Sequence, residues 1–210
     1  MSGMNAMLLT MILLSPIVSK NPVEQDTLAT FNIHIAAGVR TANDIVKSAP
    51  EFGAKIEYLL VHPLVLRTSV DYGFSSVKNS RYPLGDRRSF DIAAEAFIYR
   101  GRKKITAYLG AGAVYSVNSF KAEGRYMDTI FTVTDTIVRS ISRIEIEDKY
   151  GYRFMLGIRI QEKYSFELGY QEIRPNFLLY SPQDNDRYNI FYRPSKLSTL
   201  RITLGYIFSP

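Results

Sequence analysis

Two histidines, His34 and His62, are the only imidazoles in this sequence of 210 residues, which contains no cysteine. The absence of cysteine excludes thiolate nucleophiles, disulfides and thiolate zinc sites. Nucleophilic catalysis by a serine would need a histidine placed with that serine and a carboxylate. His34 lies on the polar side of an alternating segment and His62 lies beside Pro63 in a turn. We therefore expect no enzymatic activity, no metal and no cofactor.

Two further patterns have structural interpretations. Gly110-Ala111-Gly112 begins like a dinucleotide-binding loop, but Tyr115 occupies the position of the third glycine and no helix is predicted after it. We interpret the basic cluster at residues 102–104 as a solvated turn. The net charge is +6, yet the 26 basic residues are spread among 20 acidic ones. This distribution does not predict nucleic-acid binding.

The N-terminus is typical of a targeting sequence. The uncharged run at residues 6–18 is shorter than the roughly 20 residues that a membrane-spanning helix needs. It fits the apolar core of a signal peptide, although the preceding MSGMN has no Lys or Arg. We predict a signal peptide at residues 1–19, a lead-in at 20–30 and a barrel at 31–208. A buried segment or a membrane-anchoring stub is the alternative.

Most of the remaining sequence alternates between apolar and polar residues with a period of two, which indicates strands. The predicted strands are residues 31–39, 54–60, 64–74, 90–99, 106–117, 152–160, 164–171 and 199–208. One face of these segments carries no charge. The other face carries five basic and five acidic residues: Lys55, Glu57, Arg67, Asp71, Asp91, Glu95, Arg153, Arg159, Glu167 and Arg201.

Alternation alone does not say which face is inside, because a soluble barrel and a membrane barrel show opposite faces to solvent. Links after the second, fourth and sixth segments are short and the others are long, as in outer-membrane barrels. Eight strands leave an interior just wide enough for side chains, so glycines and charge pairs fit it better than many rings. We expect Arg67 and Asp71 to pair with Asp91 and Glu95. We expect Arg153, Arg159, Glu167 and Arg201 to pair among the last three strands. The alternatives are a soluble extracytoplasmic lipocalin-like barrel that binds a small apolar ligand and a lipid-modifying enzyme of the outer membrane.

Aromatic residues on the apolar face gather near the strand ends, where rings suit the membrane interface. They predict two lipid-facing girdles, formed by Tyr58, Tyr72, Phe74, Phe90, Tyr115, Tyr152, Tyr164, Phe166, Tyr170, Tyr206 and Phe208.

Over residues 31–208, the chain resembles the small eight-stranded outer-membrane β-barrel proteins of the OmpA/OmpX-like superfamily. The segment TLRITLGYIF is similar to the closing strand that the barrel-assembly machinery reads, although Ser209 and Pro210 follow Phe208. The resemblance implies a closed all-β, antiparallel, up-and-down transmembrane barrel with short periplasmic turns and long extracellular loops. It also implies a monomer in the outer membrane of a Gram-negative-type bacterium, with outer-membrane lipid and the assembly machinery as partners.

We expect the long loops to have a structural, adhesive or ligand-binding role, so an extracellular ligand would bind there. Within residues 118–151, alternation at 130–133 and 141–146 predicts that the fifth and sixth strands continue as a hairpin with its turn near 135–140. The loop at 172–198 either presents a ligand surface or packs on itself. Its polar and aromatic residues include Tyr180, Asp184, Asn185, Asp186, Tyr188, Phe191 and Tyr192. Basic residues near this end suit anionic lipid headgroups: Arg81, Arg87, Arg88, Arg187 and Arg193.

Overall fold

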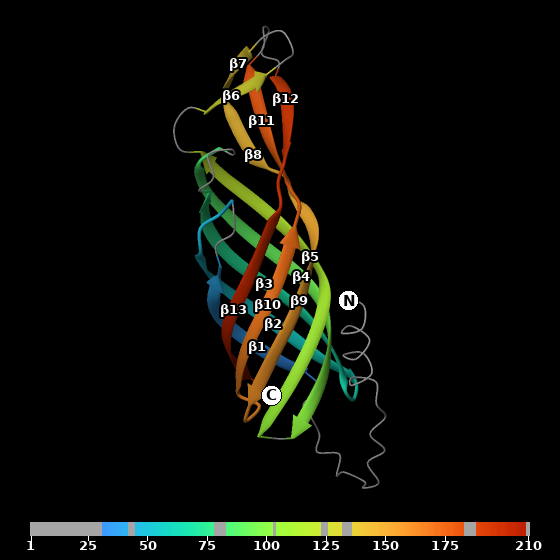
Figure 1. The fold of residues 1–210 in the computed structure, drawn as a ribbon. Coiled ribbons are helices and arrows are strands. Elements are labelled where there is room, and N and C mark those ends of the chain that lie inside the picture. Colours follow the sequence, from blue (N-terminus) through green and yellow to red (C-terminus); the bar gives the residue numbers. More distant parts are fainter. Residues whose placement is uncertain are drawn as a thin grey trace, which may run out of the picture.

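The computed structural model describes residues 31–41, 45–77, 83–102, 104–122, 126–131, 136–182 and 188–208, so the predicted signal peptide lies outside the described residues. Eight strands close into one antiparallel barrel in the spatial order β1–β13–β10–β9–β5–β4–β3–β2 (Figure 1). These are β1 (Phe31–Arg40), β2 (Ala49–Val61), β3 (Leu64–Val77), β4 (Gly85–Arg102), β5 (Ile105–Ala122), β9 (Lys149–Ile160), β10 (Tyr164–Ile173) and β13 (Leu197–Phe208). Because β1 pairs with β13 as well as with β2, the sheet has no free edge. The predicted closed, up-and-down barrel is confirmed.

The short links join β2 to β3, β4 to β5 and β9 to β10, and all lie at one end of the barrel, which we call the short-link end. The opposite end is the long-loop end. Most strands run further toward the long-loop end than alternation predicted. In particular, β2 begins at Ala49 and β4 begins at Gly85, inside stretches expected to be loop. This difference brings additional polar side chains into the barrel.

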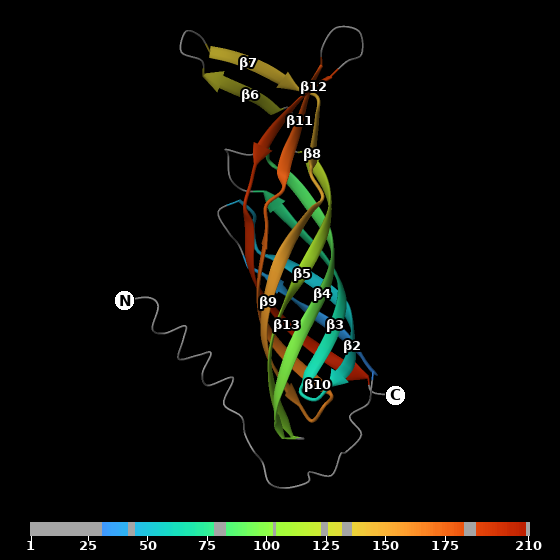
Figure 2. The same cartoon turned by 90° about the vertical axis from the view of Figure 1, so that its right-hand side faces the viewer.

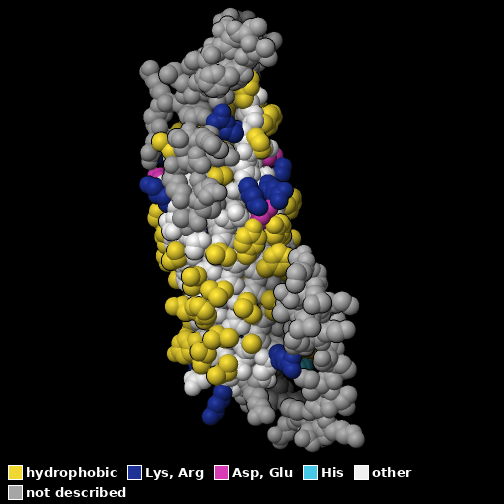
Figure 3. All heavy atoms as spheres, in the orientation of Figure 1, with side chains coloured by type: hydrophobic (Ala, Val, Ile, Leu, Met, Phe, Trp, Pro, Cys, Tyr) yellow, Lys and Arg dark blue, Asp and Glu magenta, His cyan; other side chains and the backbone are white. Residues whose placement is uncertain are grey.

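The apolar face of the strands points outward. Ile33, Ile92, Leu156, Ile202 and Leu204 are all exposed on the barrel wall, where apolar side chains form a band around the visible face (Figure 3). The charged face points into the lumen and is buried. A surface with this much exposed apolar area is stable against acyl chains and not against water. The soluble lipocalin-like alternative, which needs an apolar lumen, is therefore wrong.

Beyond the long-loop end the chain forms two further sheets (Figure 2). β6 (Tyr126–Phe131) pairs with β7 (Thr136–Ile141), and β8 (Arg143–Ile146) pairs with β11 (Asn176–Pro182), which pairs in turn with β12 (Tyr188–Pro194). The prediction that β5 and β9 continue as one hairpin, with its turn near 135–140, is wrong. Residues 136–140 belong to β7, and β8 pairs with the last long loop instead.

The physical reason for this pairing is a small apolar core outside the barrel. Ile144 and Ile146 of β8 and Phe177 and Leu179 of β11 are buried together, and the ring of Phe120 meets that of Phe177 edge to face at 5.7 Å between centroids. Local alternation shows that a segment is a strand, but only this apolar face determines its partner. The last loop thus packs on itself and on β8, which was one of its two predicted arrangements. Within the described ranges, no helix is long and apolar enough to span a bilayer.

Candidate functional site

The lumen holds all ten charged residues that the alternating pattern assigned to one face, and each of them is buried. Three more buried charges, Arg40, Glu51 and Arg87, line the lumen toward the long-loop end. Sequence reasoning missed these three because it placed strand ends too early and counted their positions as loop. Among the described residues the lumen therefore contains seven Arg and Lys against six Asp and Glu, together with His34.

Two glutamates anchor the charge network near the short-link end. Glu57 accepts hydrogen bonds from Arg67 Nε at 2.9 Å and from the Tyr99 hydroxyl at 2.7 Å, and it forms ion pairs with Arg67 and Arg159. The imidazole of His34 lies 3.1 Å from the same carboxylate. Because several donors converge on each carboxylate oxygen, Glu57 holds side chains from four strands together.

Glu167 plays the equivalent part on the opposite wall. Its carboxylate accepts hydrogen bonds from Arg67 Nη1 at 2.7 Å, from the Tyr108 hydroxyl at 2.7 Å and from Thr203 Oγ1 at 3.1 Å, and it pairs with Lys55. Arg67 thus bridges Glu57 and Glu167 across the lumen. A guanidinium suits this role because its planar fork can satisfy two carboxylates at once.

A second layer lies toward the middle of the barrel. Asp71 Oδ2 pairs with Arg153 Nη1 at 2.8 Å and with Arg201 Nη2 at 2.9 Å, while Arg201 Nε also donates to Glu51 at 3.0 Å. The Gln171 amide oxygen accepts hydrogen bonds from Arg153 at 2.7 Å. These bonds link β2, β3, β9, β10 and β13 through their side chains as well as through the backbone ladder.

A third layer closes the long-loop end. Arg40 pairs with Glu51 at 2.6 Å and with Asp91 at 2.8 Å, and Asp91 also accepts from the Ser116 hydroxyl at 2.5 Å. Arg87 donates to Asn118 Oδ1 at 2.9 Å. Arg87 was expected to face lipid headgroups, but its position on β4 turns it into the lumen.

The predicted pairing of Arg67 and Asp71 with Asp91 and Glu95 is wrong. The predicted pairing among the last three strands is also wrong, because those side chains reach β2 and β3: Arg159 pairs with Glu57, Arg153 and Arg201 pair with Asp71, and Glu167 pairs with Lys55 and Arg67. The register places Asp71 directly opposite Asp91, where two carboxylates repel each other, although it does place Arg67 opposite Glu95. In the structure Arg67 instead reaches Glu57 and Glu167, and Glu95 lies 3.7 Å from Arg153. The lumen of an eight-stranded barrel is narrow enough for long side chains to reach across it, so strand adjacency does not decide the partner.

An aromatic cluster fills the lumen beside Glu57 and Glu167, near the short-link end. The sequence analysis did not predict this cluster. Phe97 and Tyr108 point inward with ring centroids 5.6 Å apart, Tyr108 stacks on Tyr99 at 4.9 Å, and Arg67 lies 4.0 Å above the centre of the Phe97 ring. The cation over the ring face adds to the stability of the buried guanidinium. The same cluster includes Met155.

Inward-facing glycines make room for this cluster, and they are the signal that could have revealed it. Gly110 pairs with Phe97 and Gly157 pairs with Tyr108 in the strand register. A Cβ atom at Gly110 would lie 2.3 Å from Phe97 Cδ1, and one at Gly157 would lie 2.4 Å from Tyr108 Cζ. A glycine opposite a large inward residue therefore marks where the lumen is filled by a ring.

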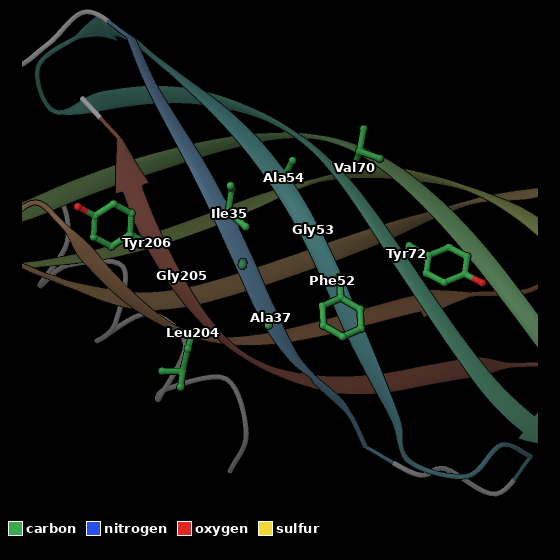
Figure 4. Close-up of a pocket in the computed structure, with 11 residues that line it drawn as sticks. Ile35, Ala37, Phe52, Gly53, Ala54, Val70, Tyr72, Leu204, Gly205 and Tyr206 are labelled. Atoms are coloured by element: carbon green, nitrogen blue, oxygen red, sulfur yellow. The ribbon is translucent and has the colours of Figure 1, made fainter. Parts of the chain in front are cut away.

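The rings predicted to form two girdles all lie on the outer wall, where Tyr115 and Tyr170 are half-buried and the others are exposed. Between them, β13, β1, β2 and β3 form a groove of about 540 Å³. Ala37 and Ala54 floor this groove, and Phe52, Tyr72 and Leu204 rise around it (Figure 4). Because it lies on the apolar wall, the groove is a depression in the lipid-facing surface and not a chamber in the lumen.

The three-stranded sheet beyond the barrel has a second, outward face. Arg143 and Glu145 on β8 pair with Tyr180 and Leu178 on β11, and Tyr192 of β12 lies next to Leu178. The Tyr180 hydroxyl donates to Glu145 at 2.9 Å, and Arg143 donates to the same carboxylate. The bond from Tyr180 lowers the pKa of Glu145, with a further contribution from Arg143, and the same bond raises the pKa of Tyr180.

A closed barrel with an apolar outer wall, ion pairs inside and all its long loops at one end has the architecture of the small outer-membrane β-barrel proteins. Among solved structures, the chain is similar to the outer membrane protein OprG from Pseudomonas aeruginosa, with a TM-score of 0.51, 15% identity, and coverage of 87% of this chain and 97% of that one. This likeness is one of fold.

Two other solved structures are more distantly similar. The chain matches Neisserial surface protein A with a TM-score of 0.48 and 17% identity, covering 86% of this chain and 97% of that one. It matches the outer membrane enzyme PagL with a TM-score of 0.42 and 11% identity, covering 85% of this chain and 99% of that one. No protein-family model and no curated protein matches the sequence.

Proposed function

We propose that this chain is a non-enzymatic barrel of the outer membrane of a Gram-negative-type bacterium that displays the β8–β11–β12 sheet outside the cell as a ligand-binding surface. The observation that supports this most is the sheet itself. It has its own apolar core, and its outward face is rich in side chains that dominate protein interfaces. Tyr192 is 65% exposed there, beside Ile190 and the Arg143–Tyr180 pair.

The filled lumen argues against transport as the main activity. Three layers of ion pairs and one aromatic cluster occupy it along its length, and eight strands enclose no wide aqueous channel. A solute could pass only if several buried ion pairs opened together. We therefore place the function at the long-loop end and assign the lumen a structural role.

The positions of the histidines support the absence of enzymatic chemistry. His34 is buried in the lumen against Glu57, away from lipid, and His62 lies in the link between β2 and β3. Neither lies on the apolar wall, where a lipid substrate would have to bind. We further propose that residues 1–19 are removed as a signal peptide and that the assembly machinery inserts the chain as a monomer by reading β13.

The orientation can be tested by cysteine labelling, because the chain has no cysteine of its own. Tyr192→Cys should react with a membrane-impermeant maleimide on intact cells. Lys104→Cys, in the link after β4, should react only after the outer membrane is permeabilised. Labelling of Lys104→Cys but not of Tyr192→Cys on intact cells would overturn the proposed orientation.

The binding surface can be tested with the full chain in lipid nanodiscs against immobilised extracellular matrix proteins and sulfated glycans. Tyr192→Ser combined with Ile190→Ser should abolish binding to any member of this panel that the unmodified chain binds. Tyr150→Ser is the matched control, because Tyr150 is exposed but lies outside the sheet. The proposal fails if no member binds, or if the control loses binding to the same extent.

A further inference from the structure

A cluster of charged side chains lies on the outer wall directly beyond the apolar band, where Figure 3 shows Lys and Arg gathered around an acidic side chain. Arg174 follows the last residue of β10, and Lys196 precedes the first residue of β13. Ile173 of β10 is paired with Leu197 of β13, so the two cations leave neighbouring strands side by side. Unlike Arg87, neither of them turns into the lumen.

One carboxylate holds both cations in place. Arg174 donates to Glu172 Oε1 through Nε at 2.8 Å and through Nη2 at 2.7 Å, and Lys196 Nζ lies 3.1 Å from Glu172 Oε2. The Tyr170 hydroxyl donates to Glu172 Oε2 at 2.6 Å. The guanidinium of Arg174 carries its positive charge at any physiological pH, because the pKa of an arginine lies above about 12.

The cluster keeps a positive charge and free surface for a ligand. Two cations share one carboxylate, which leaves a net charge of +1. Arg174 is 70% exposed and Lys196 is 56% exposed, whereas Glu172 is only 2% exposed beneath them. An approaching anion would therefore meet the two cations and not the carboxylate.

The depth of the cluster matches that of lipid headgroups. Tyr170 belongs to the girdle at the long-loop end, and Glu172 lies two residues further along β10. Two residues of a strand tilted by about 40° rise roughly 5 Å along the membrane normal. The headgroup layer extends about 5–7 Å beyond the hydrocarbon core, so the Glu172 carboxylate lies within it. The guanidinium of Arg174 and the ammonium of Lys196 lie at a similar depth, because both contact this carboxylate.

We infer that Arg174 and Lys196 form a binding site for the phosphate of an outer-leaflet lipid headgroup, with Glu172 as the positioning residue. A fork of guanidinium donors beside an ammonium is a suitable cradle for a phosphate ester. The inference rests on the proposed orientation, because the long-loop end must face the outer leaflet.

The test is native mass spectrometry of the full chain in detergent, titrated with diphosphoryl lipid A. Removing one cation from an anionic lipid contact weakens it about fivefold, so Arg174→Ala with Lys196→Ala should weaken binding about 25-fold. Lys104→Ala with Lys163→Ala is the control, because both lysines are exposed at the short-link end and carry the same total charge. Unchanged heat-modifiable mobility on gels shows that each variant is folded.

Three outcomes would overturn the inference. The first is an equal loss of lipid A affinity in the two double variants. The second is that lipid A stripped of its phosphates binds as tightly as diphosphoryl lipid A. The third is displacement of the lipid by millimolar inorganic phosphate, which would indicate a site for the free anion. Binding in detergent does not depend on which leaflet the site faces. A wrong orientation would therefore appear in the cysteine labelling while leaving this titration unchanged.

Discussion

Glu57→Gln tests whether the lumen is a dry network of ion pairs. Glu57 accepts hydrogen bonds from Arg67 and Tyr99, pairs with Arg159 and contacts His34. At an effective dielectric constant of about 20, each ion pair with charge centres about 4 Å apart contributes roughly 4 kcal/mol. Glutamine retains an acceptor and Arg67 retains Glu167, which reduces the loss. We therefore expect the free energy of unfolding to fall by about 3–5 kcal/mol, as for other broken buried pairs.

The assay is urea unfolding in phospholipid vesicles, followed by heat-modifiable gel mobility and far-ultraviolet circular dichroism. Glu145→Gln is the matched control, because it makes the same chemical change in an ion pair that is partly exposed beyond the barrel. That control should lower the free energy of unfolding by at most about 1 kcal/mol. A loss below about 1 kcal/mol for Glu57→Gln, equal to the control, would mean that water replaces the lost charge and that the lumen is not sealed.

The double variant Glu57→Gln with Arg159→Gln separates pairing from simple loss of packing. If the cost of Glu57→Gln comes from an uncompensated arginine, then removing Arg159 as well should recover part of it. The two changes should therefore show a coupling energy of about 1–3 kcal/mol. Strictly additive losses would refute the direct pairing of these two side chains.

Three further predictions test other parts of the structure. Leu156→Arg, at a wall position that is 54% exposed, should cost about 2–4 kcal/mol in the same unfolding assay if this wall faces the middle of the bilayer. Gly157→Ala should cost about 1–3 kcal/mol through overpacking against Tyr108, and Gly157→Ala in a Tyr108→Leu background should cost less. The pKa of Glu145 is lowered, so the stabilisation from its hydrogen bond with Tyr180 of β11 should be fully present above the ordinary glutamate pKa. It should be lost as pH falls through the lowered pKa. Tyr180→Phe should raise the titration midpoint of the Glu145 carboxylate, as measured by NMR.

The closed barrel could be predicted from the sequence because the signal for each strand, alternation of apolar and polar residues, lies within a short stretch of chain. A strand buried on one face and lipid-facing on the other must alternate, and the eight barrel segments do so. The outward face could also be chosen in advance, because the small cross-section of eight strands excludes a lumen filled with many large apolar side chains. The strand ends could not be predicted in the same way. Glu51 and Arg87 continue the inward face, but they lie in stretches that contain proline or glycine, which are typical of loops.

The charge partners could not be predicted because they depend on distances across the lumen. Arg67 contacts Glu167, which lies 100 positions away along the chain and on a strand that is not adjacent to β3. Register relates neighbouring strands only. The sheet beyond the barrel was missed for a similar reason, since β8 takes its partner from the last long loop through the burial of Phe177 and Leu179.

Under the proposed function, the barrel supplies stability and the sheet beyond it supplies recognition. Inside the barrel, buried carboxylates each hold donors from several strands, so a change at one position disturbs many contacts and the lumen has little freedom to acquire a ligand. Beyond the barrel, the β8–β11–β12 sheet is stabilised by one face only, and the exposed side chains of Tyr192 and Arg143 can change without loss of that core.

Phe177→Ala should show that the sheet and the barrel are stabilised separately. It should expose the sheet to proteolysis on a surface-displayed chain, because removing a buried ring costs about 3–5 kcal/mol locally, while the barrel retains its heat-modifiable mobility. If the barrel unfolded together with the sheet, the two parts would form one cooperative unit and recognition could not vary independently of the scaffold.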